Sequence, residues 1–311
     1  MTLLRYLKPL GGSESPRLYK FRIPHINCKG MTLKYAFLPS IAIILMIGAC
    51  DSPEELGGCN FVTDLEQYEL VWFDEFDGTE LDESKWSYQI GDGCDLGENL
   101  CGWGNNELQY YTDRPENVKV EDGILTITAQ REQPLYQGKQ YTSGRIRTIG
   151  KGDWRYGRID VRAKTPIGRG LWPAIWMLST DNAYGNWPTS GEIDIMEMVG
   201  SEPTHLFGTI HYGHDRHRFN GNDYYKEGGT LADEFHVYSV IWTEDCIQFM
   251  FDGEFYGEPE SRSTTFPSTW PFDQDFHMLL NVAVGGNLPG NPDGTTQFPQ
   301  SMQVDWVRVY Q

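Results

Sequence analysis

The chain has 311 residues, which is enough for one large domain or two small ones. Its apolar fraction of 39% allows a sizeable core, and its 10 Trp together with many Gly and Pro favour a β-rich fold. The net charge of -19 argues against a nucleic-acid partner, because the phosphates would be repelled.

The start of the chain has the features of an export signal. Residues 1–49 hold seven Lys or Arg and one acidic residue, so basic charge is concentrated there. The segment 31–50 begins at Met31, carries Lys34 and continues in an apolar stretch, which is shorter than the ~20 residues of a membrane-spanning helix. The stretch ends in small residues before Cys50, as a bacterial lipoprotein signal does.

We therefore expect an exported protein of the cell envelope, on the outer surface or in the periplasm, held to the membrane by a lipid on Cys50. A plain secretory signal is the alternative. Residues 1–30 precede this signal and are expected to be an over-long gene start, and residues 51–64 are predicted to be a polar tether. The folded domain is expected to span residues 65–311.

The four cysteines that follow Cys50 are candidates for disulfides, since export permits them. Cys94 and Cys101 flank a short Gly-rich loop and are the favoured pair. A bond between Cys59 and Cys246 is possible, but sequence alone does not establish the pairing.

The rest of the chain shows the pattern of a single β-rich domain, without linker or repeat. Short segments with period-two alternation and β-branched or aromatic residues recur between turn signals. These segments are residues 124–128, 157–163, 235–242, 247–251 and 303–310. No segment has a helical period over twelve residues, so the pattern predicts an all-β fold, an antiparallel β-sandwich or jelly roll.

The segment GEIDIMEMVG, residues 191–200, contains three acidic side chains. In a regular strand Glu197 would lie on the face opposite to Glu192 and Asp194, because side chains alternate. That face is apolar, and a buried unpaired carboxylate is costly there. One extra residue at a β-bulge near residues 195–196 would bring all three acids to one face.

Three acids on one face repel each other, which a purely structural strand has no reason to accept. A retaining glycoside hydrolase needs such a group, because one ionised carboxylate attacks the anomeric carbon and one protonated carboxyl protonates the leaving oxygen. We predict Glu192 and Glu197 as this pair, with Asp194 hydrogen-bonded between them. A solvated acidic strand is the alternative. The aromatic residues at 171–178 and 187–188 argue against it, since sugar rings stack on aromatic side chains.

Eight segments of the chain follow, in order, the motifs of a known family. They are WFDEFDG (72–78), GWGNNELQYYT (102–112), YTSGRIRT (141–148), GRGLWPAIWML (168–178), WPTSGEIDIMEMVG (187–200), GTIHYG (208–213), LLNVAVGGNLPG (279–290) and VDWVRVY (304–310). The sequence thereby resembles glycoside hydrolase family 16, specifically its laminarinase-like endo-β-1,3-glucanases. The resemblance implies a jelly roll with a concave substrate cleft, Glu192 as nucleophile, Glu197 as acid/base and Asp194 as helper.

The resemblance also implies residues that contact the sugar chain. The expected substrate-binding residues are Asn105, Gln109, Arg145, Trp172, Trp176, Trp187 and His211. The tryptophans would line the cleft, and the polar side chains would bind hydroxyl groups or, for His211, lie near the acid/base. A structural role is the alternative for each of them.

A calcium ion on the convex side is the one metal that the resemblance implies, with Glu75, the Gly123 carbonyl and Asp305 as oxygen ligands. Its role would be stability, since no cofactor is expected for catalysis. The alternative is a buried Asp305 that pairs with a backbone donor. No His/Cys cluster indicates zinc or iron.

Three other functions remain open at this stage. A glucan-binding protein without activity is disfavoured by the presence of all three acids. A family 16 galactanase of the agarase or carrageenase type is disfavoured by the acidic chain where the substrate is sulfated. A transglycosylase shares the covalent intermediate and is not separated by sequence. The expected partner is a β-1,3-glucan or mixed-linkage β-glucan, and the protein is expected to be a monomer.

Overall fold

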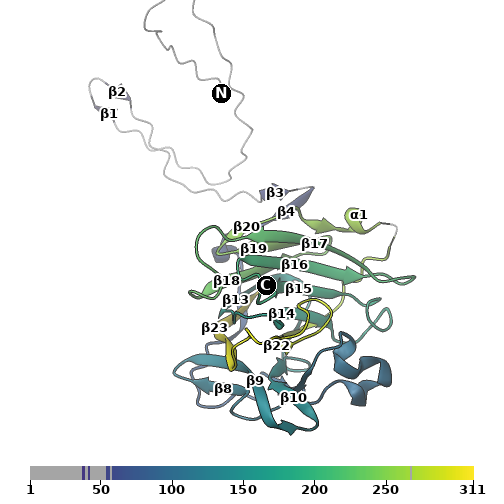
Figure 1. Ribbon diagram of the computed structural model, residues 1–311. Coiled ribbons are helices and arrows are strands. Elements are labelled where there is room, and N and C mark those ends of the chain that lie inside the picture. The colour runs from purple at the N-terminus through teal and green to yellow at the C-terminus, as the bar shows by residue number, and fades with distance from the viewer. Residues whose placement is uncertain (1–36, 39–40, 43–53, 57, 267) are drawn as a thin grey trace, which may run out of the picture. The chain divides into compact units, whose positions relative to one another are not determined.

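The computed structural model describes residues 37–38, 41–42, 54–56, 58–266 and 268–311 (Figure 1). The chain divides into two compact units, residues 1–53 and residues 54–311.

In the first unit, β1 (Phe37–Leu38) pairs antiparallel with β2 (Ile41–Ala42). The expected gene start at 1–30, the lipidation site Cys50 and most of the expected signal lie outside the described residues. Within the part of the chain that is described, no helix is long and apolar enough to cross a membrane.

The second unit is built on two large sheets (Figure 1). The 11-stranded sheet has the order β20 (Glu254–Phe255), β19 (Cys246–Phe251), β18 (His236–Trp242), β13 (Gly157–Lys164), β23 (Gln300–Tyr310), β9 (Ile124–Tyr136), β10 (Lys139–Ser143) and β7 (Gln109–Tyr111). Beside this row, β21 (Glu260–Ser261) pairs with β19, β5 (Leu70–Asp74) with β23 and β8 (Val118–Glu121) with β9.

The 8-stranded sheet has the order β17 (Arg218–Tyr225), β16 (His205–Tyr212), β15 (Glu192–Glu197), β14 (Leu171–Ser179), β22 (Phe276–Val284), β11 (Arg145–Arg147) and β6 (Ser87–Tyr88), with β12 (Asp153–Trp154) beside β22. Short helical turns complete the unit, namely η1 (Leu65–Gln67), η2 (Cys94–Leu96), η3 (Glu98–Gly104) and α1 (Arg262–Thr265). Among the described strands the pairing is antiparallel except for β10 with β7.

The core is formed by apolar side chains of both sheets. Val161 and Val240 of the 11-stranded sheet and Ile175, Ile193 and Leu280 of the 8-stranded sheet are fully buried members of one cluster. Alternation along each strand explains this, because every second side chain points into the space between the sheets. The predicted all-β sandwich is therefore confirmed, and each of the five segments predicted to be strands lies within a strand or extends one by a residue.

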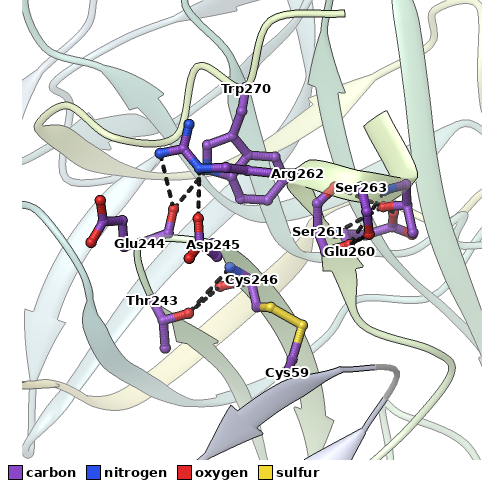
Figure 2. Close-up of a disulfide and its surroundings, with 11 residues drawn as sticks. Cys59, Thr243, Glu244, Asp245, Cys246, Glu260, Ser261, Arg262, Ser263 and Trp270 are labelled. Carbon is purple, nitrogen blue, oxygen red and sulfur yellow. Dashed lines mark hydrogen bonds and ion pairs between the residues drawn. A yellow bond between two sulfur atoms is a disulfide. The ribbon is translucent and has the colours of Figure 1, made fainter. Parts of the chain in front are cut away.

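A disulfide ties the first strands of this unit to the 11-stranded sheet (Figure 2). The hairpin of β3 (Glu54–Leu56) and β4 (Cys59–Phe61) ends in Phe61, which is fully buried, and Cys59 is bonded to Cys246 of β19. These contacts place residues 59–64, expected to be tether, on the domain itself. The physical reason is that a buried aromatic ring and a covalent bond hold the segment, despite its polar composition.

Candidate active site

The acidic strand β15 carries the bulge that its sequence predicts. Across β16, Thr209 pairs with Asp194 and Phe207 pairs with Glu197, so two steps along β16 oppose three steps along β15. The extra residue restores the phase of the alternation. Glu192, Asp194 and Glu197 consequently face the same side of the sheet, and Figure 1 shows β15 in the middle of that sheet.

The apolar residues of this strand anchor it from the other side. Ile193, Ile195, Met196 and Met198 are each almost completely buried in the core cluster. Burying four such side chains fixes the backbone of the strand, because the interior is close-packed and resists a shift of register. The carboxyl groups are therefore held on a rigid support.

Each glutamate of the strand accepts a hydrogen bond from a tryptophan. Trp187 Nε1 donates to Glu192 Oε2 at 2.8 Å, and Trp172 Nε1 donates to Glu197 Oε1 at 2.8 Å. Trp187 is 50% exposed, so its ring also presents a face to solvent. Two of the three tryptophans expected to line the cleft, Trp172 and Trp187, thus touch the predicted catalytic pair as well.

One histidine adjoins the third acid, and a second histidine adjoins the first histidine. Asp194 is buried, and its Oδ2 lies 3.1 Å from His211 Nε2, which is also 3.9 Å from Glu192 Oε1. His211 Nδ1 lies 2.7 Å from His217 Nε2, and the ring of His217 packs on Trp187 at 4.8 Å. Sequence reasoning missed His217, because its position is set by the turn between β16 and β17.

Burial raises the pKa of all three carboxyl groups of the cluster. For Glu192 the next cause is the charge of Asp194, and for Asp194 it is the charge of Glu197. His211 and the Trp172 hydrogen bond act in the opposite direction on the pKa of Glu197. The cluster can therefore keep a proton at a pH at which an exposed carboxyl has lost it.

A second group of predicted residues surrounds Arg145. Its guanidinium lies 4.5 Å from the ring centre of Trp103 and 4.8 Å from that of Trp176. Trp176 Nε1 donates to Asn281 Oδ1 at 2.7 Å. Arg145 is buried, and its Nε has no hydrogen-bond partner among the described residues. Trp103 and Asn281 were not predicted as site residues, since the spacing of residues in the sequence does not indicate a site role for either of them.

The predicted Asn105 and Gln109 meet at a buried carboxylate that the sequence did not single out. Glu107 accepts from Gln109 Nε2 at 2.6 Å and from Asn105 Nδ2 at 3.3 Å, and burial raises its pKa. Gln109 is fully buried and its Oε1 accepts from the Val284 N–H at 2.8 Å. This corrects the expectation that Gln109 faces the cleft, because both ends of its amide are occupied inside the protein.

The three predicted calcium ligands come from strands that meet in one region. Successive halves of β23 pair with β9 and with β5, so Gly123, which precedes β9, and Glu75, which follows β5, adjoin Asp305. Glu75 pairs with Arg308 through two contacts of 2.8 and 3.0 Å, and Asp305 pairs with Arg162. An ion bound here would have to displace these arginines.

Comparison with known proteins adds to this geometry. Residues 105–308 match the family described as Glycosyl hydrolases family 16. Glucan endo-1,3-beta-glucosidase A1 of Niallia circulans is 45% identical over 255 residues, which are 78% of this chain and 37% of that protein. Beta-glucanase of Rhodothermus marinus is 40% identical over 302 residues, which are 93% of this chain and 98% of that protein.

A solved structure agrees with the fold. The laminarinase catalytic domain of Thermotoga maritima superposes with a TM-score of 0.72 at 42% identity, over 78% of this chain and 98% of that chain. The likeness confirms the predicted jelly roll.

Proposed function

Because the chain belongs to family 16 of the glycoside hydrolases, we propose that it cleaves internal linkages of a β-1,3-glucan such as laminarin, or of a mixed-linkage β-glucan, with retention of anomeric configuration. One observation carries the proposal. The bulge in β15 sets Glu192, Asp194 and Glu197 on one face, where indole N–H groups hold both glutamates. The names of the relatives support the choice of substrate.

In the first half of the reaction, Glu192 attacks the anomeric carbon while Glu197 donates its proton to the leaving oxygen. The glycosidic bond breaks and an ester links the sugar to Glu192. In the second half, Glu197 takes a proton from water, the oxygen of which attacks the anomeric carbon and releases Glu192. One proton and one water molecule account for both halves.

The electrostatics of the cluster favour the retention of a proton among its three carboxyl groups. Asp194 is buried and both glutamates are partly buried, and the charge of Glu197 raises the pKa of Asp194 and of Glu192, so ionisation of all three groups together is disfavoured. Besides burial, the charges of Asp194 and Glu197 raise the pKa of Glu192, whereas His211 and the Trp172 indole lower that of Glu197. The division of roles therefore rests on the family motif and not on these shifts. His211 Nε2 lies 3.1 Å from Asp194 Oδ2, so the imidazole ring lies against the carboxyl group between the two glutamates.

The aromatic residues around the cluster suit a sugar chain. Trp172, Trp176 and Trp187 lie beside the carboxyl groups or Arg145, and the apolar faces of pyranose rings stack on such side chains. Arg145 and Asn105 would donate hydrogen bonds to hydroxyl groups.

The test uses the full chain with laminarin, lichenan, agarose and carrageenan in separate assays of reducing ends, with Glu192→Gln as control. Release from laminarin or lichenan that is abolished in the variant, with a β-configured first product by NMR, supports the proposal. Release from a galactan alone overturns the substrate. Binding of laminarin without release from any polymer overturns the activity.

We also propose that the protein is exported and anchored by a lipid on Cys50. The two disulfides among the described residues support an oxidising compartment. Expression of the wild type and of Cys50→Ala, followed by mass spectrometry of the N-terminal peptide and by membrane fractionation, tests this. An unmodified Cys50 in a soluble fraction would contradict it.

For stability we propose a calcium ion bound by Glu75, Asp305 and the Gly123 carbonyl, in exchange for the two arginine contacts. Oxygen ligands from separate chain segments suit this ion. We expect Ca²⁺ to raise the Tm relative to EDTA, and Asp305→Asn to remove the difference. An equal Tm with and without Ca²⁺ in the wild type contradicts the site.

A further inference from the structure

A loop closed by a disulfide lies beside Arg145. Residues 91–104 contain the bond between Cys94 and Cys101. Directly after it, Gly102 and Trp103 take left-handed backbone conformations with φ of 64° and 55°. Such a conformation is unfavourable for a residue with a large side chain and persists where the surroundings enforce it.

The loop directs Trp103 onto the guanidinium of Arg145. The rings of Trp176 and Tyr111 also lie within 6 Å of the guanidinium, at 4.8 and 5.9 Å, so aromatic side chains surround the group. Among the described residues, Arg145 Nε and Trp103 Nε1 are buried donors without a partner. Buried donors are almost always satisfied in folded proteins, so this pair points to an acceptor that a ligand supplies.

Arg145 faces the same side of the sheet as the acidic cluster. Across the strands, Arg145 is paired with Asn281, Asn281 with Ala174, and Ala174 with Glu197. Three strand spacings of about 4.8 Å put roughly 14 Å between the Cα atoms of Arg145 and Glu197. Two unpartnered donors at a position three strands away from Glu197 suit the hydroxyl groups of a neutral sugar next to, and not at, the scissile bond.

We propose that the Cys94–Cys101 loop is a positioning device that holds Trp103 against Arg145 and so builds a further sugar subsite. The inference rests on the proposed function and deepens it by naming the element that sets affinity for longer chains.

The disulfide adds a covalent constraint to the polar contacts that hold the loop. Gly102 follows Cys101 directly, and its N–H donates to the Asp92 carbonyl at 2.8 Å, while Lys139 pairs with the Asp92 carboxylate at 2.9 Å. Without the bond the open loop has many more conformations, and ordering it opposes binding. The subsite would then bind more weakly, although the carboxyl cluster on β15 would be unchanged.

The experiment compares two double variants of the full chain. Cys94→Ser/Cys101→Ser opens the loop, and Cys59→Ser/Cys246→Ser removes the other disulfide, which lies on β19 of the other sheet (Figure 2). For long β-1,3-gluco-oligosaccharides we expect the first variant to raise KM about tenfold, with kcat changed less than about twofold. The matched control, Cys59→Ser/Cys246→Ser, should keep the wild-type KM, and the removal of its disulfide should lower the Tm instead.

Trp103→Ala provides a second route that leaves both disulfides intact. We expect the same rise in KM, and little further rise when it is combined with the open loop, since both changes remove one subsite. A short oligosaccharide that does not reach this subsite should show no rise. An equal KM shift in the two disulfide variants, or a loss of kcat with unchanged KM, overturns the inference.

The subsite can also be tested if the wild type cleaves no β-glucan. That outcome would overturn the proposed activity but not the subsite. Calorimetry with the same long oligosaccharide is then made on Glu192→Gln, with and without the Cys94–Cys101 bond. Binding that is about tenfold weaker without the bond supports the subsite. Equal binding, or no binding in either protein, overturns it.

Discussion

Carboxylates occur in two contrasting settings in this protein. On the 11-stranded sheet Glu75 and Asp305 each pair with an arginine, Arg308 and Arg162. On the 8-stranded sheet, by contrast, no Lys or Arg among the described residues pairs with Glu192, Asp194 or Glu197. Their partners there are indole N–H groups and His211.

The difference separates carboxylates that support the fold from carboxylates that are kept for chemistry. An acid paired with an arginine on a half-buried surface contributes a little to stability. One buried and two partly buried acids without a cation reduce stability, because desolvation and repulsion both oppose their ionisation. A strand that retains such a cluster is best explained by a reaction that uses it.

The largest expected effect is the loss of activity when the acid/base is removed. We expect Glu197→Gln to lower kcat about a thousandfold, since general acid/base catalysis contributes about 10²- to 10⁴-fold. With a substrate whose leaving group needs no protonation, the Glu197→Gln variant should recover most of the rate of the first step. Steady-state and burst kinetics on laminarin and on an aryl glycoside measure both effects.

Glu75→Gln is the matched control from the other setting, because it also replaces one carboxylate by an amide. It should retain the activity of the wild type. Equal losses of kcat in Glu75→Gln and Glu197→Gln would erase the distinction between the two settings.

The next effect is a gain in stability when the cluster loses a charge. The three acids have raised pKa values in the folded protein. Their contribution to the stability of the protein is therefore fully present below the pKa that they have in the unfolded chain, and it is lost as pH rises through the pKa that they have in the folded protein. Asp194→Asn should therefore be more stable than the wild type at pH 7, by about 0.5–2 kcal/mol. The gain should shrink as pH falls towards 4, which denaturant unfolding at several pH values measures.

A stability difference for Asp194→Asn that is the same at every pH would show that charge is not its cause. A loss of stability at pH 7 would show instead that Asp194 is a structural acid, like Asp305.

A smaller effect is expected at His217, which lies outside the carboxyl cluster. We expect His217→Phe to keep the packing on Trp187 but remove the hydrogen bond that orients His211. One such bond contributes about 0.5–1.5 kcal/mol, so kcat should fall about two- to tenfold with little change in KM. His217→Gln can still form the bond and should recover activity, and unchanged kinetics in His217→Phe would remove His217 from the site.

The residue pattern by itself predicts the part of the site that one strand contains, whereas Trp172, Trp187 and His211 were expected from the family resemblance. The period of β15 fixes where a bulge is needed, and alternation in the segments around it fixes the sandwich. The contact between Trp103 and Arg145 joins segments 42 residues apart through a left-handed turn, so no local period reveals it.

Side-chain burial was also not available from sequence. Gln109 and Asn105 lie close together in one motif, yet Gln109 is fully buried and Asn105 is only partly so. The difference comes from the pairing of β7 with β10 and from the contact with Val284, both of which join distant segments.

The smallest expected effect is at the arginine of the other setting. Arg308→Met should cost about 0.5–1 kcal/mol of unfolding free energy, because the ion pair with Glu75 is partly exposed and solvent screens it. Denaturant unfolding at low and high salt measures it, and the loss should shrink at high salt. A double-mutant cycle with Glu75→Gln assigns the loss to the pair. A loss several times larger would contradict this expectation. It would mean that the folded protein needs a positively charged partner for Glu75, and that neutralisation of this carboxylate is required for folding.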